Sequence, residues 1–391
     1  MQNKSQDFQF LWQALENSKY GSLRVNLPNG EIKKFGDNLT NNFPLAEITI
    51  KDFNFINDVI CGGDIALGEG YIKGLWDSSN LSDLLSFFTL NADILEDFFH
   101  NQKFKTLLLF LHGFFRKNSK RGSKKNITAH YDLGNEFYQL WLDESMTYSS
   151  ALFDNKNLSL HEAQINKYQN ILDKLNRGSI LEIGCGWGGF AEMAAQNNHQ
   201  ITCLTISQKQ HDFARQRMIE KGLGNLAKIK LQDYRNPEEI YDNIVSIEMF
   251  EAVGKQYWEQ YFEVVANRLK ASGKAVLQII TIDEKVFKDY INRVDFIQKH
   301  IFPGGVLPAK SNIYELAKKY NLQLVGETSF GLDYAKTLEI WLKNFDEKYV
   351  EIKNLGFDDE FIRKWRFYLC YCIAGFKAYR CDVVQFELKK L

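Results

Sequence analysis

The segment LEIGCGWGGF, residues 181–190, carries the strongest signal for ligand binding in the chain. An apolar run leads into a glycine-rich turn, where Gly184 and Gly186 let a ligand lie against bare backbone. The glycines at 184, 186 and 189 also fit the GxGxxG pattern of a dinucleotide site. Glu182 argues against a dinucleotide, because its carboxylate would repel a pyrophosphate at this turn.

A cationic ligand suits the same turn better. S-adenosylmethionine (SAM) carries an ammonium and a sulfonium, which the carboxylate of Glu182 would attract. The acidic residue that would hold the ribose of NAD is also missing after the next strand, where the chain reads Thr205-Ile206-Ser207. We therefore predict a SAM site, and the plain alternative is a glycine turn that binds no ligand.

Strand and helix patterns alternate around this turn, which favours a mostly parallel sheet. The predicted strands are 179–184, 200–206, 227–233, 241–248, 274–282, 322–330 and 382–388. The predicted helices between them are 189–197, 207–222, 255–270 and 311–320. Seven strands that end in an adjacent pair are typical of the Rossmann-like class I SAM-methyltransferase fold. The predicted fold class is therefore α/β, preceded by a small N-terminal α+β domain.

Length and composition indicate two or three domains and exclude several classes of protein. The chain has 391 residues, of which 45% are hydrophobic and 25% charged, and its net charge is −1. This balance offers no global attraction to nucleic acid. The six cysteines form no paired zinc hooks, so we expect no metal site and a reducing cytoplasm. No apolar run is long enough to cross a bilayer, so we expect peripheral association with the inner face of the membrane.

The basic stretch RKNSKRGSKKN, residues 116–126, marks the clearest domain boundary. We assign residues 1–115 to the N-terminal domain, 116–127 to a linker and 128–391 to the methyltransferase domain. The apolar segment 104–115 fits a buried helix or a contact with a membrane or a second copy of the chain, and the sequence leaves this open.

Other segments have more local interpretations. Asn29-Gly30 predicts a hairpin turn, and Asn80 predicts the start of a helix. The segments 284–312 and 335–380 do not follow the alternation of the sheet, so we predict that they are lids over a substrate.

From residue 128 onward the chain resembles the family of cyclopropane-fatty-acyl-phospholipid synthases and their mycolic-acid relatives. The matching motifs, in the order of the family, are HYDLGNEFY (130–138), MTYSSALF (146–153), LEIGCGWGGFA (181–191), LTISQKQ (204–210), LQDYR (231–235), MFEAVG (249–254), IFPGG (301–305), DYAKTLEIW (333–341) and CIAGF (372–376). The resemblance implies a SAM-dependent enzyme that methylates the double bond of an unsaturated acyl chain in a membrane phospholipid and closes it to a cyclopropane ring.

The resemblance also implies roles for individual residues. The positions assigned to the cofactor are Tyr148, Ser149, Glu182, Gly184, Cys185, Gly186, Trp187, Gly188, Thr205, Gln210, Asp233, Tyr234 and Ile247. Glu251 and Tyr334 match members of a polar cluster that, in the family, holds a bicarbonate ion beside the reacting carbons. Cys372 matches a cysteine assigned to the family's active site, although its segment reads as a buried helix.

Four positions depart from the pattern of the family. Ser150 and Gln278 stand where the family commonly has Cys and His, and Ala252 stands where His often follows the glutamate. Glu248 adds a second carboxylate where relatives often have glycine. We hypothesise that Glu248 replaces or repositions the base, and the alternative is a surface or cofactor-side residue.

Methylation of an alkene needs alignment more than activation, because the double bond has no proton to remove first. Aromatic faces can stabilise the resulting carbocation, and Tyr148, Phe250, Tyr334 and Trp341 are the candidates in the matched motifs. Loss of a proton from the new methyl group closes a cyclopropane ring, whereas a hydride shift leaves a methyl-branched or methylene product. A methyltransferase for small molecules and a lipid-binding protein without catalysis are the other classes that we weigh.

Overall fold

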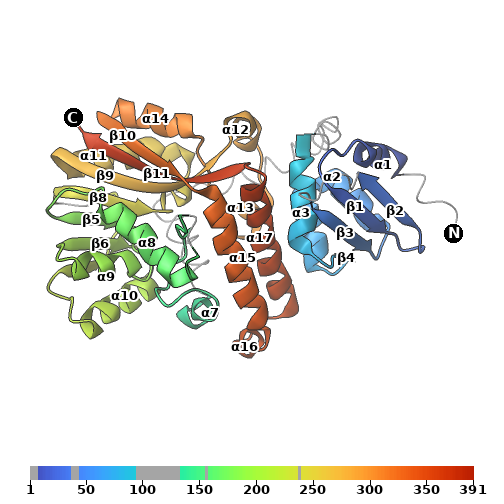
Figure 1. Cartoon of the computed structure of the whole chain (residues 1–391), viewed down its shortest axis with the longest axis horizontal. Coiled ribbons are helices and arrows are strands. Elements are labelled where there is room, and N and C mark those ends of the chain that lie inside the picture. Colours follow the sequence, from blue (N-terminus) through green and yellow to red (C-terminus); the bar gives the residue numbers. More distant parts are fainter. Residues whose placement is uncertain (1–7, 37–43, 94–132, 155–156, 237–238) are drawn as a thin grey trace. The chain divides into compact units, whose positions relative to one another are not determined.

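A computed structural model describes residues 8–36, 44–93, 133–154, 157–236 and 239–391 (Figure 1). The described chain divides into two compact units. The first contains the described residues up to 93 together with Asn292–Ile301 and Tyr349–Tyr379, and the second contains the other described residues. The apolar segment 104–115 and the basic linker lie outside the described residues. None of the described helices is long and apolar enough to cross a membrane.

The second unit is built on one seven-stranded sheet (Figure 1). Its strands are β5 (Ile180–Ile183), β6 (Ile201–Thr205), β7 (Ala227–Leu231), β8 (Tyr241–Ile247), β9 (Leu269–Ile282), β10 (Leu322–Ser329) and β11 (Cys381–Lys390). The order is β10-β11-β9-β8-β5-β6-β7, in which β11 is antiparallel to both of its neighbours and the pairs from β9 to β7 are parallel. All seven predicted strands are present, and the predicted fold class is confirmed.

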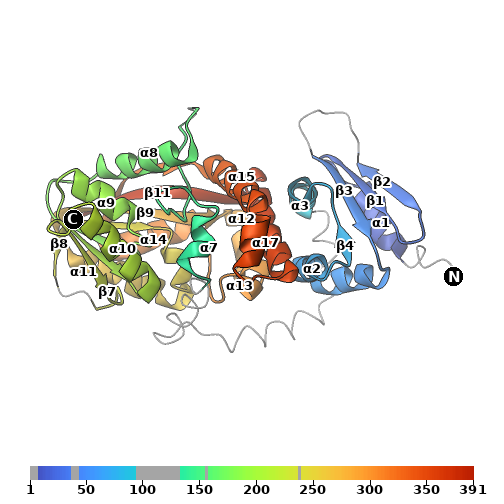
Figure 2. The same ribbon diagram turned by 90° about the horizontal axis from the view of Figure 1, so that it is seen from below.

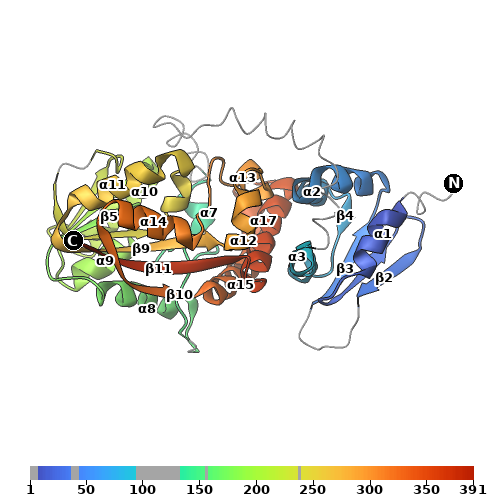
Figure 3. The ribbon, with the colours of Figure 1, turned by 90° about the horizontal axis from the view of Figure 1, so that it is seen from above.

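Helices cover both faces of this sheet, as the two rotated views show (Figures 2 and 3). The helices α8 (Leu160–Leu172) and α9 (Gly189–Gln196) lie on one face, whereas α11 (Trp258–Arg268) and α14 (Lys310–Lys319) lie on the other. The remaining helices of this unit are α7 (Asn135–Gln139), α10 (Gln208–Glu220), α12 (Glu284–Tyr290) and α15 (Gly331–Glu347), together with the short 3-10 turns Phe250–Ala252 and Lys255–Tyr257. The predicted helices are confirmed, with α11 shorter than expected because a 3-10 turn precedes it.

The buried strand β5 supplies side chains to both cores, because successive residues of a strand point to opposite faces. Leu181 and Ile183 pack into the core on the side of α11 and α14. Ile180 packs into the core on the side of α8 and α9, and the alternation places Glu182 on that same side. The side chain of Glu182 is thereby directed toward the face of the sheet that α8 and α9 cover.

The chain order reverses between β5 and β8, which are neighbours in the sheet. From β5 the chain proceeds outward through β6 and β7, and it then returns to β8 on the other side of β5. Open α/β sheets bind ligands at such a point, beyond the carboxyl ends of the strands. The loops that follow β5, β6, β7 and β8 therefore define where the site must be.

The first unit contains a four-stranded sheet of order β2-β1-β3-β4. Its elements are α1 (Gln9–Glu16), β1 (Ser22–Asn26), β2 (Ile32–Gly36), β3 (Leu45–Ile50), α2 (Asn54–Ile72), β4 (Trp76–Asp77), α3 (Leu81–Leu90), α13 (Phe296–His300), α16 (Tyr349–Asn354) and α17 (Asp359–Lys377). The hairpin predicted at Asn29-Gly30 is confirmed, since β1 and β2 pair in antiparallel fashion on either side of it. The side chain of Asn80 caps α3 as predicted, by accepting a hydrogen bond from the amide N–H of Asp83.

The two segments predicted as lids are helical in large part. Residues 284–312 include α12 and α13, and residues 335–380 include most of α15 together with α16 and α17. Asn292–Ile301 and Tyr349–Tyr379 belong to the first unit and not to the unit that contains the seven-stranded sheet. That these segments cover a substrate stays a prediction.

A capping box at the start of α8 gives a direct test of what holds this helix. Replacing Ser159 by Ala should lower the free energy of unfolding by about 1 kcal/mol, because its side chain accepts a hydrogen bond from the amide N–H of Glu162. Ser159→Asn keeps an acceptor at the cap and should stay within about 0.5 kcal/mol of the unsubstituted protein. Urea unfolding measures both variants, and an equal loss in the two would contradict the role of the cap.

Candidate active site

The glycine loop after β5 presents backbone on one side and side chains on the other. Gly184 and Gly186 are partly exposed, whereas Cys185 and Trp187 are buried beneath them. Gly184 has a φ of 83°, and a Cβ atom there would lie 2.6 Å from the side chain of Met249. Only glycine fits this conformation and this contact. The side chains of Cys185 and Trp187 are therefore largely covered, and the loop presents mainly glycine backbone to a ligand.

Glu182 is a buried carboxylate with an unused acceptor. Its side chain is 2% exposed, and its Oε2 atom has no hydrogen-bond partner. Burial raises the pKa of Glu182 to about 7, while a hydrogen bond with Cys203 and the charge of Lys167 act in the opposite direction. A buried acceptor without a donor is costly, so this atom indicates a place for a ligand group that carries a proton or a positive charge.

The other predicted cofactor residues lie beyond the carboxyl ends of neighbouring strands. Thr205 ends β6, and its hydroxyl donates to Oε1 of Gln210 (3.0 Å). Asp233 and Tyr234 follow β7, where the Asp233 carboxylate pairs with the guanidinium of Arg235 (2.5 Å). Ile247 ends β8. The fold thus brings these residues to the edge of the sheet where the chain order reverses.

The segment Ser149–Phe153 is irregular, and side chains from two helices satisfy its backbone. From α8, Gln164 donates to the carbonyl oxygen of Ser149 (2.9 Å). From α15, Thr337 accepts the amide N–H of Ala151 (3.1 Å) and Asp333 accepts that of Phe153 (2.8 Å). These contacts fix the backbone on either side of Ser150.

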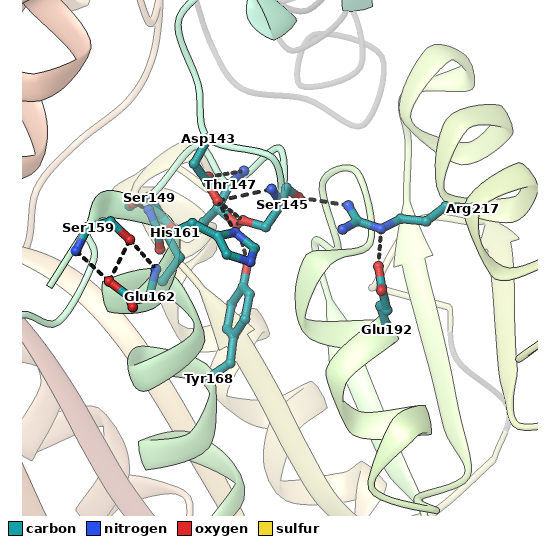
Figure 4. A network of polar contacts seen from close by, with 11 residues as sticks. Asp143, Ser145, Thr147, Ser149, Ser159, His161, Glu162, Tyr168, Glu192 and Arg217 are labelled. Atoms are coloured by element: carbon teal, nitrogen blue, oxygen red, sulfur yellow. Dashed lines mark hydrogen bonds and ion pairs between the residues drawn. The ribbon is translucent and has the colours of Figure 1, made fainter. Parts of the chain in front are cut away.

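A chain of hydroxyl groups holds the loop of residues 143–147 against α8 (Figure 4). The Ser145 hydroxyl donates to the carboxylate of Asp143 (2.6 Å) and also contacts the hydroxyl of Thr147 (2.6 Å). Thr147 in turn contacts the hydroxyl of Tyr168 on α8 (2.6 Å). A Cβ atom on Gly189 would lie 2.7 Å from the hydroxyl oxygen of Tyr168. The hydroxyl groups therefore pack directly on the end of the glycine loop.

Arg217 on α10 closes this network from the other side (Figure 4). Its guanidinium donates to the carbonyl oxygen of Ser145 (2.7 Å) and forms an ion pair with Glu192 on α9. The loop that carries Tyr148 and Ser149 is therefore tied to α8, α9 and α10.

The carboxylate of Glu248 is the centre of the cluster that contains the predicted catalytic residues. The amide N–H of Ser150 (2.9 Å) and Nε2 of Gln278 (2.7 Å) both donate to its Oε1 atom. The Tyr334 hydroxyl donates to its Oε2 atom (2.7 Å). The structure thus brings Ser150, Gln278 and Tyr334 together around a carboxylate of the protein. The hydroxyl of Ser150 does not take part, because it donates to the carbonyl oxygen of Ala151 (3.0 Å).

The backbone of Glu248 adopts a left-handed conformation, with a φ of 49°. An L-residue other than glycine rarely adopts this region, and such strain persists where the surroundings enforce it. The backbone N–H of Glu248 donates to the carbonyl oxygen of Gln278 (2.8 Å), which holds the strained residue against β9. Glycine would occupy this position without strain.

Glu251 contrasts with Glu248 in its hydrogen bonding. Its Oε1 atom accepts a hydrogen bond from the amide N–H of Ile280, and its buried Oε2 atom has no hydrogen-bond partner. Burial, followed by the charge of Glu248, raises the pKa of Glu251 to about 8. Two neighbouring carboxyl groups whose environments differ in this way can serve as an acid and a base at neutral pH.

Three of the four aromatic candidates belong to one cluster. The ring of Tyr148 lies 5.4 Å from that of Trp341, and Trp341 lies 6.1 Å from Tyr334. Phe250 packs instead against Trp258 (5.4 Å) in the core on the side of α11. The role of Phe250 is therefore core packing, whereas the other three rings lie beside the Glu248 cluster.

Cys372 and the Glu248 cluster belong to different units of the chain. Cys372 lies on α17, which belongs to the first unit, whereas the other predicted site residues all belong to the second. The side chain of Cys372 is partly buried.

Sequence reasoning missed two lysines that bear on the cluster. Lys167 is fully buried on α8, and Nζ of Lys174 donates to Oε1 of Gln385 (2.8 Å). Gln385 then donates to Oε1 of Gln278 (3.1 Å), which leaves the amino group of Gln278 directed at Glu248. Lys167 could have been found from its sequence, because it occupies the apolar stripe of a helix at which a charge is unexpected.

Comparison with known proteins places the chain among enzymes that modify lipids. The family profile for mycolic acid cyclopropane synthetase matches residues 118–386. The tuberculostearic acid methyltransferase UfaA1 of Mycobacterium tuberculosis is 34% identical over 338 residues, which cover 83% of this chain and 79% of that protein. The cyclopropane-fatty-acyl-phospholipid synthase of Escherichia coli is 34% identical over 339 residues, which cover 85% of each protein.

A solved structure supports the same conclusion. The mycolic acid cyclopropane synthase CmaA1, complexed with SAH and CTAB, is 29% identical to the chain and superposes with a TM-score of 0.65. The superposition covers 68% of this chain and 98% of that protein.

The protonation state of Glu182 should control the affinity of the protein for SAM. Because burial raises its pKa to about 7, the carboxyl group is largely protonated in mild acid and gains charge as the pH rises. The affinity for the cationic cofactor should therefore increase roughly tenfold from about pH 5.5 to about pH 7.5. Calorimetric titration measures this, and Glu182→Gln should bind more weakly with no such rise. If the affinity of Glu182→Gln for SAM rose with pH as steeply as that of the unsubstituted protein, the pH dependence would belong to another group.

Proposed function

The chain belongs to the mycolic acid cyclopropane synthetase family and is a SAM-dependent methyltransferase, and we propose that it methylates the double bond of an unsaturated acyl chain in a membrane phospholipid. The observation that carries the proposal is the Glu248 cluster, which places a carboxylate beside a cofactor loop and an aromatic surface. An alkene substrate requires such a site, because it needs proton removal after the attack and not before it.

The residues around the glycine loop fit SAM. Gly184 and Gly186 offer exposed backbone, and the unpartnered oxygen of Glu182 offers a negative group to a cation. When bound, SAM supplies an electrophilic methyl group on a positively charged sulfur. We assign to its site the predicted positions Tyr148, Ser149, Glu182, Gly184, Cys185, Gly186, Trp187, Gly188, Thr205, Gln210, Asp233, Tyr234 and Ile247.

The aromatic cluster fits the charge that develops on the acyl chain. Attack of the double bond on the methyl group leaves a carbocation on the neighbouring chain carbon. The faces of Tyr148, Tyr334 and Trp341 carry negative quadrupole charge and can stabilise a cation without reacting with it. Their closeness to Glu248 puts cation stabilisation and proton removal in one place.

We propose that Glu248 is the base of this reaction and that its carboxylate takes the place of a bound bicarbonate. The backbone N–H of Ser150 and the side chains of Gln278 and Tyr334 donate to Glu248, so these donors already have a carboxylate as their partner. Glu251, which burial and the neighbouring charge keep protonated at neutral pH, leaves Glu248 as the ionised member of the pair.

The position of Glu248 favours formation of the ring. Glu248 directly precedes Met249, and a Cβ atom on Gly184 of the cofactor loop would collide with the side chain of Met249. The backbone that carries the base is therefore close to the cofactor loop. Glu248 can take a proton from the new methyl group while the electrons of the C–H bond form the third bond of the cyclopropane.

The methyl-branched product is the second candidate, and it is also favoured by an observation. Both carboxylate oxygens of Glu248 already accept hydrogen bonds, which weakens the group as a base. A slower proton removal gives time for a hydride shift along the acyl chain. The similarity to a tuberculostearic acid methyltransferase agrees with this outcome.

Deuterium labelling separates the two products. The purified protein is incubated with SAM that carries a CD₃ group and with vesicles of a monounsaturated phospholipid, and the released acyl chains are analysed by mass spectrometry. We expect a saturated product with two deuteriums in the added carbon, which means ring closure. Three deuteriums with a retained double bond would establish the branched product. Label in a soluble phenol or amine, with none in lipid, would contradict the lipid substrate.

Substitution of Glu248 tests its role as the base. Glu248→Gln should lower kcat at least about 100-fold, which is a typical loss for a general base. Glu248→Gly removes the carboxylate and suits the left-handed backbone, so it should free the three donors and make turnover depend on added bicarbonate. The unsubstituted enzyme should not respond to bicarbonate. Glu220→Gln, at an exposed carboxylate on α10, is the control. Full turnover in Glu248→Gln would remove this residue from the mechanism.

A further inference from the structure

Lys167 is an unusual lysine. Its side chain is fully buried, and it is the one Lys or Arg in the described part of the chain of which this is true. It lies on the inner face of α8, among Ala163, Gln164 and Tyr168. Its Nζ atom donates to the hydroxyl of Ser149 (2.7 Å). Lysine is almost never buried unless it is paired with a negative charge, so this position needs an electrostatic explanation.

Carboxylates on three elements supply that charge. Glu248 at the end of β8 has the largest electrostatic effect on Lys167, followed by Asp143 in the loop before α8 and Glu182 on β5. Burial lowers the pKa of Lys167 to about 7, and the charges of these three groups oppose that shift. The ring of Tyr168 lies 4.5 Å from Nζ and adds a cation–π contact.

The contacts of Lys167 lead directly to Glu248. Lys167 holds the hydroxyl of Ser149, and the amide N–H of the next residue, Ser150, donates to Oε1 of Glu248. Burial raises the pKa of Glu248, and the charge of Lys167 is the largest of the influences that oppose this rise. The ammonium and the carboxylate thus flank one short segment of backbone.

A second series of hydrogen bonds also leads from a lysine to the Oε1 atom of Glu248. The ammonium of Lys174 donates to Gln385, Gln385 donates to Gln278, and Gln278 donates to Oε1 of Glu248. A cation at one end and an acceptor at the other fix the direction of every hydrogen bond between them. This series is therefore consistent only with donors directed at an anion.

We infer that Lys167 is a positioning residue, which keeps the Glu248 carboxylate ionised for the proton transfer and holds the Ser149–Ser150 segment against it. The inference rests on the proposed role of Glu248 as the base. Lys167 itself neither gives nor takes a proton in the step, because the proton passes from the new methyl group to Glu248. Its contribution is the positive charge that stabilises the anion inside a buried site.

Lys167→Gln separates the charge from the hydrogen bond. Glutamine can still donate to Ser149 but carries no charge, so the acid limb of the profile of kcat against pH should move to higher pH by about one unit or more. The shift should appear in kcat, at saturating SAM and phospholipid vesicles, since Glu248 acts in the bound complex. An effect through Glu182 would appear instead in the KM for SAM. Lys167→Arg keeps a cation and should hold the limb close to its original pH.

The controls keep the outcomes distinct. Lys270→Gln removes a lysine that pairs with Asp242 (2.9 Å) at the amino ends of the strands, and it should leave the profile unchanged. An acid limb of Lys167→Gln that coincides with that of the unsubstituted enzyme overturns the inference. If Lys167→Gln does not fold, a shifted limb in Lys167→Arg overturns it and an unshifted limb supports it. Unimpaired Glu248→Gln would instead defeat the proposed function.

Discussion

The carboxylate of Glu248 is the interaction on which the arrangement of the site depends. Its three donors come from the loop before α8, from β9 and from α15, so one side chain joins elements that are distant in sequence. A carboxylate fixes the direction of every donor around it, since it is acceptor-only when ionised. The strained backbone at this residue is maintained by the same contacts, because a left-handed glutamate needs surroundings that over-determine it.

Charge balance explains why so many ionisable groups can be buried together. Burial raises the pKa of Glu182, Glu251 and Glu248, and at Glu248 a cation and three hydrogen-bond donors oppose this shift. Lys167 supplies a buried positive charge, and SAM brings another when it binds. An isolated buried ion would be strongly unfavourable, so these groups are stable only as a set. The site is consequently sensitive to the loss of any single charge.

The sequence predicted the fold and the position of the cofactor loop because both follow from local patterns. Alternation of apolar strands and helices, together with Gly184 and Glu182, is visible without tertiary contacts. The cluster could be predicted only through resemblance, since Ser150, Gln278 and Tyr334 meet only in the folded chain. The contact between the facing strand residues Gln278 and Gln385 depends on the register of β9 with β11, which no local pattern specifies.

A base that belongs to the protein differs physically from a base that binds from solution. A tethered carboxylate is present in every turnover and does not depend on the concentration of a free anion, but its reach is limited by its own backbone. At Glu248 that backbone is left-handed and is held by the carbonyl oxygen of Gln278, so the carboxylate has little freedom to follow a moving proton. The choice between ring closure and a branched product therefore becomes a question of the distance from one fixed carboxylate to the new methyl group. In a site of this kind, product specificity resides in the residues that hold the base as much as in the base itself.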